Sequence, residues 1–267
     1  MPNSESHFLS VIVPVYKQEQ TIVADIQNIQ NTLRQIRYDY EIICVVDGTD
    51  IDKSYKLLKQ AKIYKTKILG YRLNHGKGYA VRYGMAHTKG DYVAFIDSGM
   101  EIDPNAISMV LEHMEWYNAD IIVASKRHPA SIVNYPFHRQ IISFCAQIVA
   151  KYLLGINVRD TQAGLKIFKR QVLIKVLPRL LVKNYAFDLE ILSVSNYLGF
   201  NRIFEAPIKL NYDHTAFTHA VGSKVIYRAL VDALSVFYRL RIKKYYDDKN
   251  KRKWVYDKDL DMRVNVG

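Results

Sequence analysis

The sequence predicts an α/β protein: a mostly parallel central sheet with helices on both faces and an amphipathic helix near the C-terminus. Two patterns predict this class. In the first half of the chain, apolar runs of strand length alternate with segments of helical spacing. These runs are almost continuously apolar, as in strands that are buried on both faces. No long internal repeat or linker rich in glycine and serine interrupts the pattern, so we expect one main domain.

The first half supplies the regular part of this pattern. Its opening helix places Ile22, Ile26, Ile29 and Leu33 on one face, and Pro104 is suited to the first turn of its last helix. The predicted strands are Leu9–Tyr16, Tyr40–Val46, Thr66–Tyr71, Asp91–Ile96 and Ala119–Ser125. The predicted helices are Thr21–Ile36, Asp52–Ala61, Tyr79–Thr88 and Ala106–Trp116.

The second half is less regular. The predicted helices are Gln140–Leu154, Phe187–Leu198 and Val221–Lys244, and the predicted strands are Gly164–Phe168 and Arg202–Ile208. The tail from Tyr245 to Gly267 is rich in charge, and we expect it to be partly mobile. We therefore divide the chain into a main domain, residues 1–213, and a C-terminal helix with its charged tail, residues 214–267.

Composition limits the class of protein. Of the 267 residues, 49% are hydrophobic, which is enough for one sizeable core. A transmembrane helix needs about 20 consecutive apolar residues, and the chain has no such run. Met1 to His7 are polar, so we expect no signal segment either. Cys44 and Cys145 lie in apolar surroundings and are expected to be buried thiols in a reducing compartment.

The net charge narrows the choice of partners. A value of +12 suits molecules that carry phosphate, namely nucleotides, nucleic acid or an anionic membrane surface. The sequence contains no RRM, zinc-finger or helix-turn-helix pattern, so we expect no nucleic acid among the partners. A nucleotide and a membrane surface remain.

Polar residues follow each predicted strand of the first half. The carboxyl ends of parallel strands meet at one edge of a sheet, which is the usual place for a ligand crevice. Taken singly, these segments have ordinary explanations: Asp47-Gly48 is a common turn, and Lys126-Arg127 can be a solvated charge pair. The prediction of a site therefore rests on their coincidence. The segments are Pro14–Glu19, Asp47–Asp50, Asn74–Gly78, Asp97–Glu101 and Ser125–His128.

Two of these segments indicate the kind of ligand. Asp97 and Glu101 follow a buried strand, where carboxylates are costly unless a cation meets them. Oxygen ligands suit Mg²⁺ or Mn²⁺, and such ions usually arrive with a phosphate. Gly76-Lys77-Gly78 precedes a helix and can hold a phosphate through its N–H groups, although it lacks the spacing of a P-loop. A solvated acidic turn is the alternative for Asp97 and Glu101.

An ordered set of segments carries a resemblance to a known family. The segments are VIVPVYKQE, VVDGTD, NHGKGYAVRYGM, FIDSGMEIDP, SKRHP, RDTQAGLKIFKR and FDLEIL. From Leu9 to Asp213 the chain resembles glycosyltransferase family 2, which has the GT-A fold, and within it the polyprenyl-phosphate sugar synthases related to dolichol-phosphate mannose synthase. The set is specific for the superfamily and much less specific for the sugar or the acceptor.

The resemblance implies a donor site. Pro14, Tyr16 and Glu19 would hold the base and ribose of a nucleotide sugar, with Asp47 assisting. Lys77 would lie near the phosphates of the donor. Transfer then requires that the charge developing on the leaving diphosphate be neutralised by a divalent ion and nearby cationic side chains.

The resemblance also implies a metal site. Asp97 matches the first acid of the family's DxD motif, and Gly99 stands where the second acid would be. Glu101 matches a further metal-contacting position at which the synthases usually have Gln. We therefore expect Asp97 and Glu101 to hold Mg²⁺ or Mn²⁺, with the donor diphosphate and water completing the coordination shell.

On the acceptor side, the resemblance implies a lipid phosphate. Such a phosphate is already an anion near neutral pH, so it needs positioning by cations more than a general base. The candidate cations are Lys126, Arg127 and Arg139. Ser143 lies four residues after Arg139, on the same helix face, and this spacing matches the acceptor-phosphate pair of the synthases. The alternative is a solvated arginine in an ordinary first turn.

Three more residues are candidates for binding sugar or acceptor. In related enzymes the loop with Asp160 and Gln162 faces the sugar or acceptor; Gln162 could bond a sugar hydroxyl, and Asp160 could act as base if the acceptor were an alcohol. The alternative for Asp160 is a turn residue or an ion pair with Arg159 or Lys166. Asp188 is expected either to contact the acceptor or sugar or to serve the cap and dipole of its helix.

The helix predicted over Val221–Lys244 has an apolar stripe and mostly basic polar positions, which suits an anionic membrane surface. Packing on the sheet is the alternative. The sequence thus predicts an inverting glycosyltransferase, peripheral on the cytoplasmic face of a membrane, that moves a hexose from a UDP- or GDP-sugar to a polyprenyl phosphate. A saccharide or other hydroxyl acceptor, and a nucleotide-sugar-binding protein with impaired catalysis, remain open.

Overall fold

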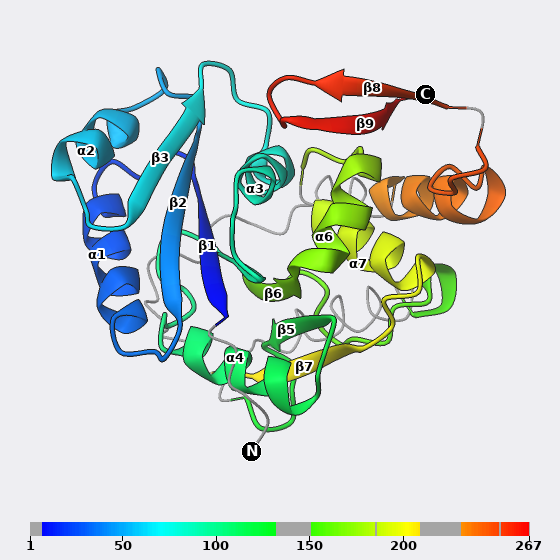
Figure 1. The fold of residues 1–267 in the computed structure, drawn as a ribbon, viewed down its shortest axis with the longest axis horizontal. Helices are drawn as coiled ribbons and strands as arrows, with labels where there is room; N and C mark the ends of the chain where they lie inside the picture. The colour runs from blue at the N-terminus through cyan, green and yellow to red at the C-terminus, as the bar shows by residue number, and fades with distance from the viewer. Residues whose placement is uncertain (1–6, 132–150, 185, 209–230, 251, 267) are drawn as a thin grey trace.

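The computed structural model describes residues 7–131, 151–184, 186–208, 231–250 and 252–266. A seven-stranded sheet runs through them in the order β3-β2-β1-β4-β6-β5-β7 (Figure 1). The strands are β1 (Phe8–Val15), β2 (Asp39–Asp47), β3 (Thr66–Tyr71), β4 (Tyr92–Ile96), β5 (Ile121–Ser125), β6 (Leu165–Lys169) and β7 (Ile203–Pro207). Neighbouring strands are parallel except where β6 pairs with β4 and β5. The predicted mostly parallel sheet is confirmed.

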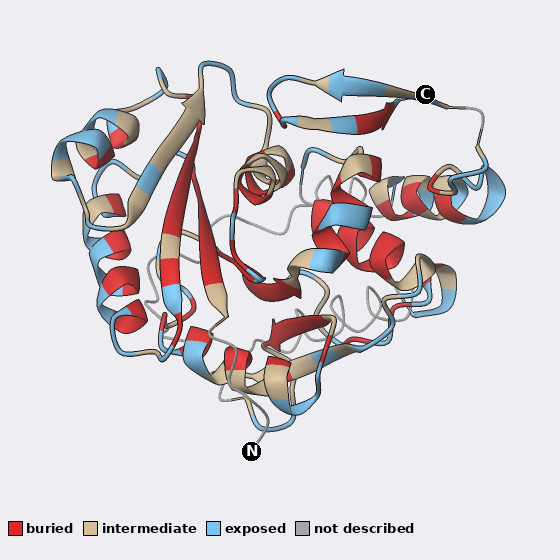
Figure 2. Ribbon diagram, in the orientation of Figure 1, coloured by how far each residue is buried: buried red, intermediate tan, exposed pale blue. Residues whose placement is uncertain are grey.

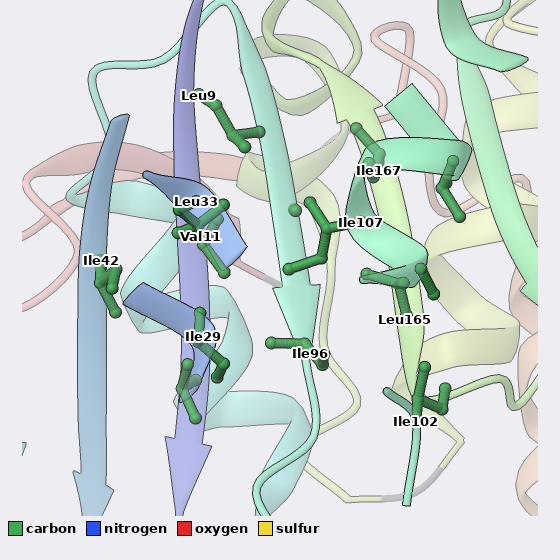
Figure 3. Packing of buried hydrophobic residues seen from close by; sticks show 14 of the residues in the cluster. Leu9, Val11, Ile29, Leu33, Ile42, Ile96, Ile102, Ile107, Leu165 and Ile167 are labelled. Atoms are coloured by element: carbon green, nitrogen blue, oxygen red, sulfur yellow. The ribbon is translucent and has the colours of Figure 1, made fainter. Parts of the chain in front are cut away.

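Both faces of the sheet are apolar because successive strand residues point to opposite sides. On β1, Leu9 and Val11 belong to one buried cluster and Ile12 belongs to the other. Figure 2 shows β1 and most of β2 as buried, which explains why their sequences are almost continuously apolar. In Figure 3, Val11 lies between Leu33 and Ile29 from a covering helix, so strand and helix share one core.

Helices cover both faces, as predicted. They are α1 (Ile22–Leu33), α2 (Ser54–Ala61), α3 (Lys77–Ala86), α4 (Ala106–Trp116), α6 (Arg170–Val176) and α7 (Phe187–Tyr197). The buried hydrophobic residues of α1, α2 and α4 belong to the cluster around Val11. Those of α3, α6 and α7 belong to the cluster around Ile12. The described ranges contain no helix that is both long and apolar enough to cross a bilayer.

Strand β6 runs against its neighbours, and this reversal brings a loop to the site. Leu165, the first residue of β6, pairs with Ile96, the last residue of β4. The N–H of Asp97 then donates to the carbonyl oxygen of Gly164 at 2.9 Å. The loop before β6 is therefore held at the carboxyl end of β4. If β6 were parallel to β4, its carboxyl end would lie there instead, and this loop would lie at the opposite edge of the sheet.

The C-terminal segment is more ordered than the sequence predicts. Strands β8 (Lys253–Asp257) and β9 (Met262–Val266) form an antiparallel hairpin, whereas we expected a partly mobile tail. Oδ1 of Asp257 accepts the N–H groups of Asp259 and Leu260 at 2.9 and 3.1 Å and closes the turn. In β8 the apolar residues Trp254, Val255 and Tyr256 stand together between two charged ends, so the strand gives no alternating signal.

Part of the predicted C-terminal helix can be followed. Residues 231–237 are α-helical and continue into a short π-helix, η2 (Tyr238–Ile242). Val236, Leu240 and Tyr246 are fully or almost fully buried in the cluster around Ile12, so this segment is part of the main core. The start of the predicted helix Val221–Lys244, most of Gln140–Leu154 and Cys145 lie outside the described residues. Cys44 is a buried free thiol, as predicted.

Candidate active site

Lys77 and Asp97 form the centre of the candidate site. Asp97 directly follows β4, and Lys77 is the first residue of α3, two residues earlier than the predicted start of that helix. Nζ of Lys77 lies 2.8 Å from Oδ2 of Asp97, and their side chains are 24% and 33% exposed. The pair is therefore within reach of a ligand at the carboxyl edge of the sheet, where the sequence analysis expected it.

A buried ion pair stands behind this centre. Asp188, near the start of α7, lies 2.5 Å from Nζ of Lys166 on β6 and 3.9 Å from Nζ of Lys77. Burial lowers the pKa of Lys166, and the neighbouring Asp188 opposes that shift. Lys166 also donates to the carbonyl oxygen of Ala163 at 2.7 Å. Asp188 makes no side-chain cap at α7, so holding the two lysines is the role that its contacts support.

Asp47 organises the turn that precedes Lys77. Its carboxylate accepts the side-chain amide of Asn74 at 2.9 Å and the backbone N–H groups of His75 and Gly76 at 2.7 and 2.9 Å. Asp47 is 3% exposed. The resemblance implied that Asp47 would assist in holding a nucleotide; the contacts in the structure give it the shaping of the Asn74–Gly76 turn.

The remaining residues predicted for the donor lie at or just after the carboxyl end of β1. Pro14 is within β1 and pairs with Val45, while Tyr16 lies just after the strand with 45% exposure. Oε2 of Glu19 accepts the N–H of Lys53 at 3.0 Å. Tyr16 is thus an accessible ring beside the carboxyl edge, and Glu19 ties the loop after β1 to the loop after β2.

A second group of charges involves Glu101 and the loop before β6. Nζ of Lys126 lies 2.6 Å from Oε1 of Glu101, and the N–H of Lys126 donates to Oδ2 of Asp160 at 3.0 Å. Arg127 donates from Nη1 to the carbonyl oxygen of Arg159 at 3.0 Å. Burial raises the pKa of Asp160, and the Lys126 ammonium opposes that shift. The structure therefore brings together Glu101, Lys126, Arg127 and Asp160.

The backbone accounts for Gly99, where the family's second acid would stand. Gly99 has φ +91° and Met100 has φ +55°, so the chain takes two left-handed steps directly before Glu101. Such a φ is costly for residues with a side chain. Oδ2 of Asp25 on α1 accepts the N–H of Gly99 at 3.3 Å, and burial raises the pKa of Asp25. A buried carboxyl thus supports the turn by way of its backbone.

The residues present are suited to a divalent cation. Oδ1 of Asp97 is buried and has no hydrogen-bond partner among the described residues. A buried carboxylate oxygen in that state is costly, and a cation would satisfy it. No cluster of three or more His, Cys, Asp or Glu side chains within the described ranges could hold a metal alone. A metal at Asp97 and Glu101 would therefore need oxygen ligands from the donor, as expected from the sequence.

Several residues complete the comparison with the sequence predictions. Gln162 is exposed and open to a ligand, whereas Arg139 and Ser143 lie outside the described residues. The sequence analysis missed the parts played by Asp25 and Lys166, because a carboxylate within a helix gives no local signal and a lysine within an apolar strand gives only a weak one. The spacing Leu165-Lys166-Ile167, a lysine between buried apolar residues, is the one hint that Lys166 needs a buried partner.

Comparison with known proteins identifies the family of this chain. The family model "Glycosyl transferase family 2" matches residues 10–177, more than half of the chain. The chain belongs to glycosyl transferase family 2. This confirms the family to which its ordered motifs were assigned.

Curated relatives and solved structures extend the comparison. A dolichyl-phosphate beta-glucosyltransferase from Dictyostelium discoideum is 26% identical over 207 residues, 72% of this chain and 63% of the relative. Another from Drosophila melanogaster is 29% identical over 213 residues, 74% of this chain and 65% of the relative. The chain therefore spans just under two thirds of the length of these relatives.

The crystal structure of glucosyl-3-phosphoglycerate synthase from Mycobacterium tuberculosis in complex with Mn²⁺, uridine-diphosphate-glucose and phosphoglyceric acid has the same fold. It superposes with a TM-score of 0.62 at 17% identity and covers 86% of this chain and 80% of that one. The predicted GT-A fold is confirmed by this likeness.

Proposed function

We propose that this chain is an inverting hexosyltransferase that moves a hexose from a UDP- or GDP-sugar to a polyprenyl phosphate. The observation that carries the proposal is the contact between Lys77 and Asp97 at the carboxyl edge of the sheet, with an unpartnered oxygen of Asp97 beside it. The two relatives are named for glucosyl transfer to dolichyl phosphate, which supports a hexose and a polyprenyl phosphate.

On the donor side, Asp97 and Glu101 would hold Mg²⁺ or Mn²⁺. The crystal structure with Mn²⁺ and uridine-diphosphate-glucose supports a divalent ion. When bound, the metal would neutralise charge on the diphosphate. Lys77 would supply further positive charge where the leaving group gains it, and Tyr16, with its exposed ring, would contact the base. Asp188 and Lys166 would keep the ammonium group of Lys77 in place.

On the acceptor side, a phosphate oxygen of the lipid would attack the anomeric carbon from the face opposite the diphosphate. The new bond between the phosphate oxygen and the anomeric carbon forms as the bond from the anomeric carbon to the diphosphate oxygen breaks. The electron pair of the broken bond stays on the diphosphate that leaves. Attack from the opposite face inverts the configuration at the anomeric carbon. The acceptor is already ionised, so positioning by Lys126, Arg127, Arg139 and Ser143 would be sufficient. The raised pKa of Asp160 favours one alternative: a hydroxyl acceptor, for which Asp160 would take the proton.

A transfer assay tests the function. The full chain would be incubated with UDP- and GDP-hexoses, Mn²⁺ and either a polyprenyl phosphate or a saccharide acceptor. We expect product with the lipid phosphate, and we expect Asp160→Asn to retain most of that activity. Product only with the saccharide, lost in Asp160→Asn, would support the hydroxyl acceptor. Nucleotide-sugar binding without any transfer would support a binding protein with impaired catalysis.

An anionic membrane surface is the partner proposed for the C-terminal helix, on the cytoplasmic face. Val231, Leu234, Tyr238 and Ile242 recur at helical spacing and are 41%, 54%, 48% and 61% exposed. Basic residues lie beside the end of this stripe, at positions 241, 243 and 244. An exposed apolar stripe that ends in cations suits the headgroup region of an anionic leaflet.

Flotation with anionic liposomes tests this partner. We expect the chain to float at low salt and Ile242→Glu to reduce the floated fraction. Ile174→Glu is the matched control, because Ile174 is an equally exposed isoleucine, 61%, on α6 outside the stripe. Equal flotation of the two variants would contradict the role given to the stripe.

A further inference from the structure

Glu190 is a fully buried carboxylate that the proposed reaction does not use. It lies on α7 and is 0% exposed. Oε2 accepts the backbone N–H groups of Leu181 and Val182, each at 2.9 Å. Oε1 accepts the hydroxyl of Tyr246 at 2.6 Å and lies 3.7 Å from Nη2 of Arg239. One carboxylate therefore joins the loop before α7 to two residues of the C-terminal segment.

The loop that Glu190 holds packs against the turn that carries Lys77. The carbonyl oxygen of Lys183 accepts the N–H of Tyr79, in the first turn of α3, at 3.0 Å. A Cβ at Gly76 would lie 2.7 Å from that same oxygen and 2.3 Å from Oδ1 of Asn184. A Cβ at Gly78 would lie 2.8 Å from the carbonyl oxygen of Asn184. The loop thus lies in direct contact with the residues on both sides of Lys77.

The electrostatics reach the same helix by a second route. Arg82, on α3, has its pKa lowered by burial, and the negative charge of Glu190 opposes that shift. Burial raises the pKa of Tyr246, so its hydroxyl stays protonated and able to donate to Glu190. Glu190 accordingly acts on α3 both through the Leu181–Asn184 loop and through its charge.

We propose that Glu190 is a positioning residue for the donor diphosphate: with Tyr246 it presses the Leu181–Asn184 loop against the Gly76–Gly78 turn and so holds Lys77 in place. The inference rests on the proposed function, which gives this turn the diphosphate. On this proposal the C-terminal segment, through Tyr246, helps to position Lys77 in the donor site.

The test compares two tyrosine variants. Tyr246→Phe keeps the ring and removes the hydroxyl that binds Glu190. Tyr197→Phe removes a hydroxyl that binds Oδ1 of Asp247, also in the C-terminal segment, at 2.6 Å but does not touch the loop. Both variants lose one tyrosine–carboxylate hydrogen bond of 2.6 Å, so a general loosening of the C-terminal segment affects both. Tyr246→Phe also loses the hydrogen bond that the hydroxyl accepts from Nε of Arg239 at 3.1 Å, a second contact within the C-terminal segment.

Two measurements decide the matter. In the transfer assay we expect Tyr246→Phe to raise KM for the nucleotide sugar about fivefold, the factor typical of one hydrogen bond, with kcat little changed. Amide hydrogen exchange should become faster at Tyr79 and across residues 181–184. Tyr197→Phe should change neither quantity. Glu190→Gln, which keeps one carbonyl oxygen as an acceptor, should raise KM further.

The outcomes separate the inference from the function on which it rests. If Tyr246→Phe matches Tyr197→Phe in KM and in exchange at Tyr79, Glu190 does not position the turn, and the inference is wrong while the proposed function stands. If the wild-type chain transfers no sugar, the proposed function fails. Exchange at Tyr79 then still decides whether the Glu190 contact holds the turn.

Discussion

Gly76 offers a direct measurement of how tightly the donor turn is packed. Its φ is +97° and its ψ is 159°, a conformation open almost only to glycine. Replacement by alanine costs about 1–3 kcal/mol for the backbone alone. The new methyl group would also lie 2.7 Å from the carbonyl oxygen of Lys183, which is main chain and cannot swing away. Overpacking of this kind adds about 1–3 kcal/mol. The free energy of unfolding of Gly76→Ala should therefore be about 2–6 kcal/mol lower than that of the wild-type chain.

Gly199→Ala is the matched control for this prediction. Gly199 has a φ of +95°, and a Cβ built there meets nothing within 4 Å. The free energy of unfolding of Gly199→Ala should fall only by the cost of the backbone conformation, about 1–3 kcal/mol. The free energy of unfolding of both variants would be measured by urea denaturation, and UDP binding by titration calorimetry. If the two variants lose equal stability, or if Gly76→Ala binds UDP as tightly as Gly199→Ala, the packing of the turn does not matter as we argue.

Two further predictions concern buried charges. Burial raises the pKa of Asp160 in the folded chain above the value of 3.8 expected for the unfolded chain. At pH values between the unfolded and the folded pKa, the folded chain therefore binds more protons than the unfolded chain. The free energy of unfolding accordingly falls as the pH rises through this window. Asp160→Asn should remove this fall, seen as a flatter plot of unfolding free energy from pH 4 upward; an unchanged slope would contradict it. Lys166→Met leaves Asp188 buried beside a thioether and should cost about 3–5 kcal/mol in urea denaturation. Adding Asp188→Asn should recover part of that loss, and a double variant no more stable than the single one would count against the ion pair.

The sequence predicts the parallel half of the sheet well, because burial on both faces leaves a continuous apolar signal. Thr66–Tyr71 and Ala106–Trp116 have the predicted bounds, and the other elements of the first half differ from theirs by at most three residues at either end. The hairpin of β8 and β9 was missed because its strands are short and lie in a stretch rich in charge. Pairing between distant segments gave it a partner that no local pattern records.

The site divides in the same way. Residues at strand ends, such as Asp97 and Lys77, could be predicted because parallel strands bring their carboxyl ends to one edge. In the sequence, Glu190 is only one letter of the segment FDLEIL, although both of its oxygens accept hydrogen bonds in the structure. Its partners Leu181 and Tyr246 are joined to it by the path of the backbone and by the position of the C-terminal segment. The spacing of residues along a short stretch of sequence contains no information on the path of the backbone or on the position of the C-terminal segment.

The balance of charge at the carboxyl edge leads to a last prediction about the metal. Asp97 and Asp188 face Lys77 and Lys166, and Glu101 faces Lys126. A diphosphate alone would bring new anionic oxygens to Asp97, and two unit charges 4 Å apart repel by about 4 kcal/mol at an effective dielectric constant of 20. A divalent cation that entered with the diphosphate would remove that repulsion and satisfy Oδ1 of Asp97.

Nucleotide and metal should therefore bind together. In titration calorimetry we expect UDP or GDP to bind at least tenfold more tightly with Mn²⁺ than with EDTA, since tenfold corresponds to about 1.4 kcal/mol, well within the repulsion removed. Asp97→Asn removes one of the opposing charges as well as a metal ligand, so it should weaken binding with Mn²⁺ and improve or preserve binding with EDTA. An equal loss of nucleotide affinity with Mn²⁺ and with EDTA would mean that Asp97 contacts the nucleotide without a cation. Gly99, in place of the second acid of the DxD motif, would then indicate a site that works without the metal.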